Sequence, residues 1–317
     1  MIHTPTAAEI GSLLAKNDPE DAWVTALSIA RRINPGYDPA LARIVFDDVM
    51  RLFHGEYPGY CPIKTLYHNL PHTLGVFLCA ARLMHAVHIL GTPISDDEIT
   101  MVMMATLMHD VGYAQRSDEE TGTGAQFTLN HVSRGVEFMR HYLAERQFPH
   151  GLAESLEPMM LTTDRTIPFT QLAFPDERTR LLGQILGTAD LTGQMADRAY
   201  LEKLMFLYLE FKEANFGNYQ SVYDLLRQTE SFYATTRDKL DGELGGLYKK
   251  LSFHFEDTLG VDKNYYLESI EKNIAYLSKI TLLNEKEYLS MLKRDRIVEK
   301  AQGMIAPNKV RIENTLQ

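Results

Sequence analysis

The fold is organised around the stretch Leu107-Met108-His109-Asp110-Val111-Gly112-Tyr113, in which a histidine directly precedes an aspartate where an apolar helix is expected to end. Both side chains can bind a divalent metal ion. Consecutive residues on a helix diverge by about 100°, so His109 and Asp110 can approach one ion only at an open helix end or in a shared cavity. Gly112 is predicted to supply that end, as a glycine after the last helical turn often does.

Outside this stretch, apolar residues recur at helical spacing along almost the whole chain, and alternation of period two never extends beyond a few residues. The sequence therefore predicts an all-α fold in which strands are rare or absent. Ser95, with Glu98 three residues later, is typical of a capping box at the start of the helix that leads to His109. Other helices are expected near Thr6, from Pro19, and over residues 40–53, 73–90, 130–146, 152–163 and 176–191, with nearly continuous helix after Asp197.

Two histidines lie at the start of the helix that begins near residue 70. Asn69 is predicted to cap this helix, and Pro71 is tolerated in its first turn because proline's missing N–H has no helical partner there. This arrangement places His72 in the first turn and His68 just outside it.

Composition limits the function classes. The 317 residues suggest about two domains of roughly 150 residues, or one large helical domain. A net charge of -10 argues against binding to a nucleic-acid duplex or a membrane surface. Only Cys61 and Cys79 are present, so a reducing compartment is expected. The start, Met1 to Pro5, lacks the basic and apolar regions of a signal peptide, so a cytoplasmic location is predicted, and a polar end from Asn308 is expected to fray.

Four side chains are candidates for one metal site: His72, His109, Asp110 and Asp190. Two imidazoles and two carboxylates suit Zn, Mn or Fe better than Ca. Because an aspartate has two oxygens, Asp110 could also reach a second ion such as Mg or Mn. Two such ions can activate a water molecule and assist an in-line attack on phosphorus.

Each candidate also has an ordinary structural interpretation. An isolated histidine on an apolar helix is more often a core or surface residue than a ligand. Asp190 lies in a mostly apolar stretch and needs a partner if buried, and a helix cap, Arg180 or Arg198 would serve as well as a metal. The conjunction of four candidates favours the metal site.

The order of these motifs resembles the metal-dependent phosphohydrolases of the HD superfamily, and is closest to the catalytic domain of the class I cyclic-nucleotide phosphodiesterases. The resemblance covers about residues 60 to 215. It implies a multi-helix bundle of the HD/phosphodiesterase type with helical N- and C-terminal extensions. It rests on the runs Tyr67-His68-Asn69 with His72, His109-Asp110, Leu161-Thr162-Thr163-Asp164 and Thr188-Ala189-Asp190-Leu191.

The resemblance implies a role for each matching residue. His68 corresponds to the general acid that protonates the leaving alkoxide, a role that needs a histidine outside the metal shell. Asp110 would reach both ions, and Thr163, in the segment that ends at Asp164, would touch a water held by the metal. Tyr67 and Asn69 would orient the site. The ligands of the tighter metal would be His72, His109, Asp110 and Asp190.

The sequence departs from the phosphodiesterase pattern in two places. Gly112 to Gln115 follow the HD pair where that class has another histidine, while His131 resembles the histidine that other HD phosphohydrolases use toward the second metal. Both a ligand role and a non-ligand role for His131 stay open. The purine-clamping Gln and Phe are not recognisable in residues 251–280, so specificity for cyclic nucleotides is not predicted. The expected substrate is a small phosphoester, and the phosphodiester of a (cyclic) nucleotide is one candidate.

Two other functions stay open. One is a di-iron oxygenase of the HD superfamily, which uses more histidine ligands, and the other is a non-catalytic signalling module on an HD-like scaffold. The expected organisation is one continuous structural domain: N-terminal helices in residues 1–55, a catalytic core in 56–235 and a helical extension in 236–317. Residues 277–303 could form an interaction helix or the seam of a homodimer.

Overall fold

The computed structural model describes residues 6–119 and 121–304. Within these residues the architecture is all-α, as predicted, and the extended structure is limited to an isolated antiparallel bridge between Tyr60 and Arg116. The expectations for Met1 to Pro5 and for the polar end from Asn308 lie outside the described residues. The first half of the chain forms α1 (Ala7–Leu14), α2 (Pro19–Ile33), α3 (Ala40–His54), α4 (Leu70–Ile89), α5 (Asp96–Met108) and α6 (His131–Glu145).

The second half continues with longer helices and short 3-10 segments. The α-helices are α7 (Leu152–Leu161), α8 (Glu177–Ala196), α9 (Tyr200–Glu213), α10 (Val222–Asp241), α11 (Leu251–Leu259) and α12 (Tyr265–Thr281), and residues 297–304 are also helical. The 3-10 segments are Val111–Tyr113, Ala125–Phe127, Phe169–Gln171, Leu247–Lys250, Tyr288–Ser290 and Arg294–Arg296.

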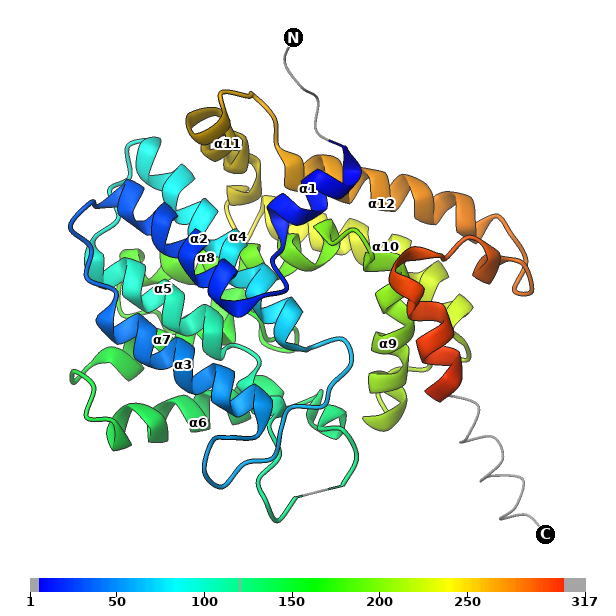
Figure 1. Cartoon of the computed structure of the whole chain (residues 1–317), viewed down its shortest axis with the longest axis horizontal. Helices are drawn as coiled ribbons and strands as arrows, with labels where there is room; N and C mark the ends of the chain where they lie inside the picture. The colour runs from blue at the N-terminus through cyan, green and yellow to red at the C-terminus, as the bar shows by residue number, and fades with distance from the viewer. Residues whose placement is uncertain (1–5, 120, 305–317) are drawn as a thin grey trace.

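Helix α4 is the central helix of the bundle. It packs against α2, α5, α8 and α11, and α8 in turn packs against α5, α7 and α12 (Figure 1). By length and composition α4 could cross a membrane, but 78% of its apolar window is buried inside the molecule. That burial is what the core helix of a folded protein requires, because an apolar helix without a polar face must be covered on all sides.

The predicted helix starts follow from local capping. The Asn69 side chain accepts a hydrogen bond from the backbone N–H of His72 at 3.2 Å, so His72 lies in the first turn of α4 as expected. At α5, the side chains of Ser95 and Glu98 form the expected capping box. Helix α8 continues past the predicted end near residue 191 to Ala196, so Asp190 lies inside the helix.

Buried apolar side chains from Ile10 to Ala301 form one continuous core among the described residues. In Figure 1, α3, α5, α6 and α7 lie toward the left, and α9 and α12 lie toward the right. The N-terminal helix α2 packs on α4, and α12 packs on α8, so segments from both ends of the chain contribute to the same core. The division at residues 55 and 235 stays a prediction.

Candidate metal centre

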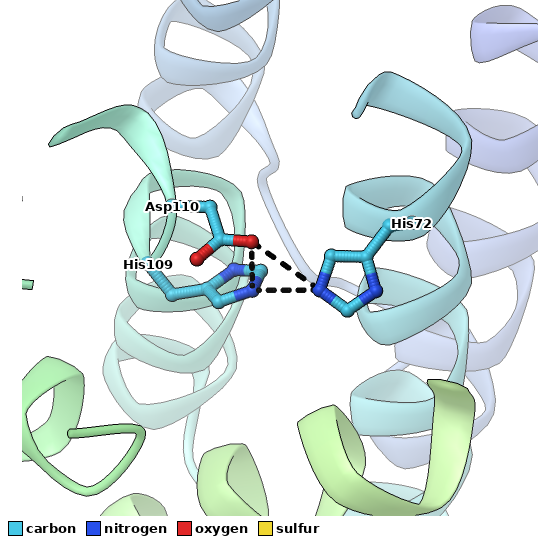
Figure 2. A group of neighbouring side chains, drawn as sticks. All are labelled: His72, His109 and Asp110. Atoms are coloured by element: carbon cyan, nitrogen blue, oxygen red, sulfur yellow. Dashed lines mark hydrogen bonds and ion pairs between the residues drawn. The ribbon is translucent and has the colours of Figure 1, made fainter. Parts of the chain in front are cut away.

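Helix ends bring the first three candidate ligands together. His72 projects from the first turn of α4, and His109 and Asp110 follow the last residue of α5 (Figure 2). His72 Nε2 lies 3.3 Å from His109 Nε2 and 3.3 Å from Asp110 Oδ2. His109 Nε2 lies 3.2 Å from the same oxygen. These three atoms therefore form a triangle of ligand atoms that could face one ion.

Gly112 plays a different part from the one expected. Helix α5 ends at Met108, residues 111–113 form a 3-10 turn, and Gly112 does not adopt the left-handed conformation of a helix-ending glycine. The prediction of a glycine cap was therefore wrong. A Cβ at this position would lie 1.8 Å from the carbonyl oxygen of His131, so glycine is required because α6 approaches the backbone closely.

Asp190 reaches the same point from the middle of α8. Its Oδ1 lies 3.4 Å from His72 Nε2 and 3.9 Å from His109 Nε2. Asp190 therefore approaches the Nε2 atoms of the two histidines, rather than the carboxylate of Asp110. Ligand atoms around an ion with bonds of about 2.0–2.2 Å lie roughly 3–3.5 Å apart, so the spacing fits one coordination shell with modest adjustment.

The hydrogen-bond pattern around His109 favours a positive charge at this group. His109 Nδ1 lies 2.7 Å from the Thr106 carbonyl oxygen, which only accepts, so Nδ1 carries the proton. In the neutral imidazole, Nε2 then presents a lone pair toward Asp110 Oδ2, which is buried and has no hydrogen-bond partner. Lone pairs that face one another repel, and a divalent ion among them would remove that repulsion.

The pKa shifts of His72, His109 and Asp110 also favour positive charge on the imidazoles and negative charge on the carboxylate. Burial alone would lower the pKa of His109, but the carboxylates of Asp110 and Asp190 outweigh it and raise the pKa to about 9. The pKa of His72 is raised by the same balance between burial and these carboxylates. Burial would raise the pKa of Asp110, but the neighbouring histidines hold it well below its usual range. A bound metal ion would supply this positive charge in place of the protons, because ligands lose their protons when they bind a metal.

His131 approaches Asp110 from the other side. Its Nε2 lies 3.5 Å from Asp110 Oδ1, whereas His72 and His109 face Oδ2. His131 Nδ1 lies 2.8 Å from the Thr128 carbonyl oxygen, so its Nε2 also presents a lone pair. Burial lowers the pKa of His131 and favours this neutral form. One oxygen of Asp110 therefore faces two imidazole nitrogens and the other faces one, as in a bridging carboxylate.

His68 lies beside these ligands but has a different partner. Its Nδ1 lies 2.6 Å from Glu210 Oε2, on α9, and its ring stacks on Tyr113 with centroids 4.9 Å apart. The Glu210 carboxylate also accepts the backbone N–H groups of Tyr67 at 2.6 Å and His68 at 3.3 Å. Burial alone would lower the pKa of His68, but Glu210 outweighs it and raises the pKa. The imidazole is therefore held in one orientation in which a proton on Nε2 is favoured.

The remaining predicted residues surround the cluster. Tyr67 donates its hydroxyl proton to Gln194 Oε1 at 3.0 Å, and its ring lies against His68 and His72. Asn69 caps α4, as described above. Thr163 and Asp164 follow α7 and line a cavity beside the cluster, where the Asp164 carboxylate accepts hydrogen bonds from the N–H and hydroxyl of Thr166.

This cavity has a volume of about 730 Å³, which is within the range of small-molecule sites. His68, Asp110, His131 and Asp190 all line it. One wall is mainly apolar and comes from α9 and the segment after it: Leu204, Leu207, Phe211, Phe216 and Tyr219. The cavity therefore offers room for much more than a single phosphate group next to the cluster.

Three neighbours of the site have no motif in the sequence. Glu210 holds His68, Gln194 holds Tyr67, and the buried Tyr113 lies between His68 and His131, stacked on both rings. Tyr113 follows Asp110 by only three residues, and this closeness in sequence was the single signal that could have predicted its place in the site. The other two lie more than 120 residues from the side chains they contact.

Comparison with known proteins identifies a family without defining an activity. A family model described as Npun_R2479-like matches residues 60–239, which is more than half of the chain and includes every candidate ligand. No curated protein and no solved structure gave a match to this chain.

Proposed function

The chain belongs to the Npun_R2479-like family, and we propose that it is a metal-dependent phosphohydrolase on a helical bundle of the HD/phosphodiesterase type. The proposed substrate is a small phosphoester, such as the phosphodiester of a (cyclic) nucleotide, and the proposed location is the cytoplasm. The observation that carries this proposal is the convergence of His72, His109, Asp110 and Asp190 around one point, with Asp110 Oδ2 buried and unpartnered.

The residues divide into two sets of ligands. His72, His109, Asp110 and Asp190 would hold one ion, of Zn, Mn or Fe, because they combine imidazole and carboxylate donors. The other oxygen of Asp110 and Nε2 of His131 would hold a second, of Mg or Mn. When bound, two such ions polarise the phosphoryl group and lower the pKa of a water molecule.

The chain's own residues supply the proton for the leaving group. His68 lines the cavity, and Glu210 occupies its Nδ1, so the proton available to a substrate is the one on Nε2. As the phosphorus–oxygen bond breaks, this proton passes to the leaving oxygen, and Glu210 stabilises the imidazolium before the transfer. Tyr113, stacked on His68, restricts the ring to this orientation.

The oxygenase alternative would need further histidine ligands near the cluster. His141 and His150 are the remaining histidines between His131 and Asp190, and both side chains are exposed. The arrangement of His68 with Glu210 instead suits proton donation, which supports hydrolysis. A non-catalytic module would have no use for this proton donor.

The test is metal content and hydrolysis in Asp110→Asn, which keeps the side chain's shape. The wild-type protein is expected to bind about two divalent ions and to hydrolyse bis(4-nitrophenyl) phosphate, while the variant should lose both properties. Asp47→Asn, an exposed carboxylate on α3, is the matched control. Metal binding and turnover retained in Asp110→Asn would end the proposal.

The general acid is tested separately. His68→Asn should retain the ions but lose about 10²–10⁴-fold in rate with alkoxide leaving groups. With 4-nitrophenolate the loss should be much smaller, because that leaving group needs little protonation. An equal loss with both leaving groups would assign His68 another role.

A further inference from the structure

A lysine lines the same cavity as the metal cluster. Lys239, on α10, is part of the cavity wall together with Asp110 and Asp190. Its Nζ makes a hydrogen bond of 3.4 Å to the Thr162 carbonyl oxygen. That is a long contact for a charged donor. The ammonium group therefore retains donors that could bind a molecule in the cavity.

The contacts of Thr162 place this lysine close to the metal ligands. The side chain of Thr162 donates to the carbonyl of Gly183 on α8, and a Cβ at Gly187 would lie 3.1 Å from Thr162 Oγ1. Gly187 precedes Asp190 by three residues, which corresponds to roughly 4.5 Å along the helix axis. Lys239 therefore contacts a residue that packs on α8 one turn before Asp190, and the charge of Asp190 acts on Lys239.

Within residues 6–119 and 121–304, no carboxylate forms an ion pair with Lys239. Asp190, a candidate metal ligand, and Asp164 are near enough to affect its charge, and Asp164 Oδ1 already accepts two hydrogen bonds from Thr166. Glu243 also affects it, and that residue is exposed to solvent. Burial lowers the pKa of Lys239. A partly buried ammonium without a close counter-ion is costly, and such costs are characteristic of binding sites.

A second cation lies at the exposed side of this wall. The guanidinium of Arg165 stacks over the Phe232 ring at 4.5 Å, and both residues line the cavity. No carboxylate pairs with Arg165 in the part of the chain that the structure describes. Lys239 and Arg165 therefore form a positively charged wall beside a cluster that contains two carboxylates.

We propose that Lys239, assisted by Arg165, binds a second anionic group of the substrate, separate from the phosphoryl group at the metal cluster. This inference rests on the proposed function and narrows its substrate class to phosphoesters with an additional phosphate or carboxylate. The cavity of about 730 Å³ accommodates the remainder of such a molecule between the two anions.

The experiment measures binding, so it does not depend on turnover. Full-length protein with its bound metal is titrated calorimetrically with α,ω-alkane bisphosphonates of increasing chain length, each beside the alkyl monophosphonate of the same length. Their carbon–phosphorus bonds resist hydrolysis. At one chain length the bisphosphonate should bind about tenfold or more tightly than its partner, since a hydrogen bond between charged groups has this effect.

Lys239→Gln should abolish this advantage and leave monophosphonate binding within about threefold. Lys272→Gln, an exposed lysine on α12, should leave both affinities unchanged. A bisphosphonate advantage that survives in Lys239→Gln, or its absence at every length in the wild type, would overturn the proposal. Equal weakening of both ligands would also overturn it, because Lys239 would then contact the phosphoryl group at the metals.

Thermal unfolding separates binding from a structural role. If the only role of Lys239 were its hydrogen bond to the Thr162 carbonyl, Lys239→Gln would lower the melting temperature. The ratio of bisphosphonate to monophosphonate affinity would then stay unchanged. The proposal predicts an unchanged or higher melting temperature, because a partly buried unpaired charge is removed. Bisphosphonate selectivity without phosphohydrolase activity would refute the proposed function but retain this subsite.

Discussion

Helix α4 carries a histidine near each end, and the two lie in clusters of opposite electrostatic character. His72 lies with His109 beside the carboxylates of Asp110 and Asp190. His85, near the other end, lies with His254 of α11, and their Nδ1 atoms are 3.1 Å apart. The carboxylate near this second pair is that of Asp257, which is 45% exposed.

The difference distinguishes a histidine pair suited to a positive charge from one suited to neutrality. In the His85–His254 pair, one Nδ1 can donate its proton to the other, so two neutral rings satisfy each other. Burial lowers the pKa of His254 to about 2, which keeps the pair uncharged. In the His72–His109 pair, the Nδ1 proton of His109 is donated to the Thr106 carbonyl and two carboxylates face the rings, so a positive charge is favoured there.

Metal removal should produce the largest contrast between the clusters. If the ions are present at about 1,000 times their dissociation constant, chelation should lower the free energy of unfolding by about 4 kcal/mol. Urea unfolding with and without chelator measures this change. His254→Gln should show the same chelator effect as the wild type, because no ion is assigned to the second pair. Stability unaffected by chelation would contradict the assignment.

The next effect concerns the carboxylate that orients His68. Glu210→Gln keeps the volume of the side chain but removes its charge, so the rate should fall about 10–100-fold, as for the loss of an outer partner of a site. Because Glu210 raises the pKa of His68, the basic limb of the pH–rate profile should move to lower pH. Glu230→Gln, on an exposed face of α10, serves as the control and should leave both properties unchanged.

The second pair should govern acid stability. The pKa of His254 is about 2 in the folded chain and about 6.5 in an unfolded one, so its contribution is present above pH 6.5 and is lost as the pH falls. Between pH 7.5 and pH 5 the free energy of unfolding should fall by about 2 kcal/mol from this group. His254→Gln should remove that part of the pH dependence, whereas exposed His141→Gln should retain it.

The smallest effect is expected for the carboxylate beside the second pair. Asp257 contacts His85 Nε2 at 3.5 Å and Arg32 at 3.5 Å, but its side chain and that of Arg32 are about half exposed. Exposed ion pairs contribute below about 1 kcal/mol, so Asp257→Asn should change the urea midpoint only slightly. If Asp257→Asn lowered stability to urea as much as metal removal does, the proposed difference between the two histidine clusters would be wrong.

Several features of the site were predictable because their signals are local. Asn69 and Ser95 act within one helical turn, so the starts of α4 and α5 follow from neighbouring residues. The same signals place His72 at a helix start and His109 with Asp110 at a helix end. The prediction for Gly112 failed because its cause is the close approach of α6, which comes from a distant part of the chain.

The sequence alone determined an all-α fold and the set of candidate ligands, because helix periodicity, caps and residue chemistry are encoded over short distances. Only the tertiary structure decided which side chains meet. Packing of α4, α5 and α8 brings Asp190 to His72, and packing of α9 brings Glu210 to His68, across more than 100 residues in each pair. Such contacts depend on the burial of whole helix faces, which no local pattern specifies.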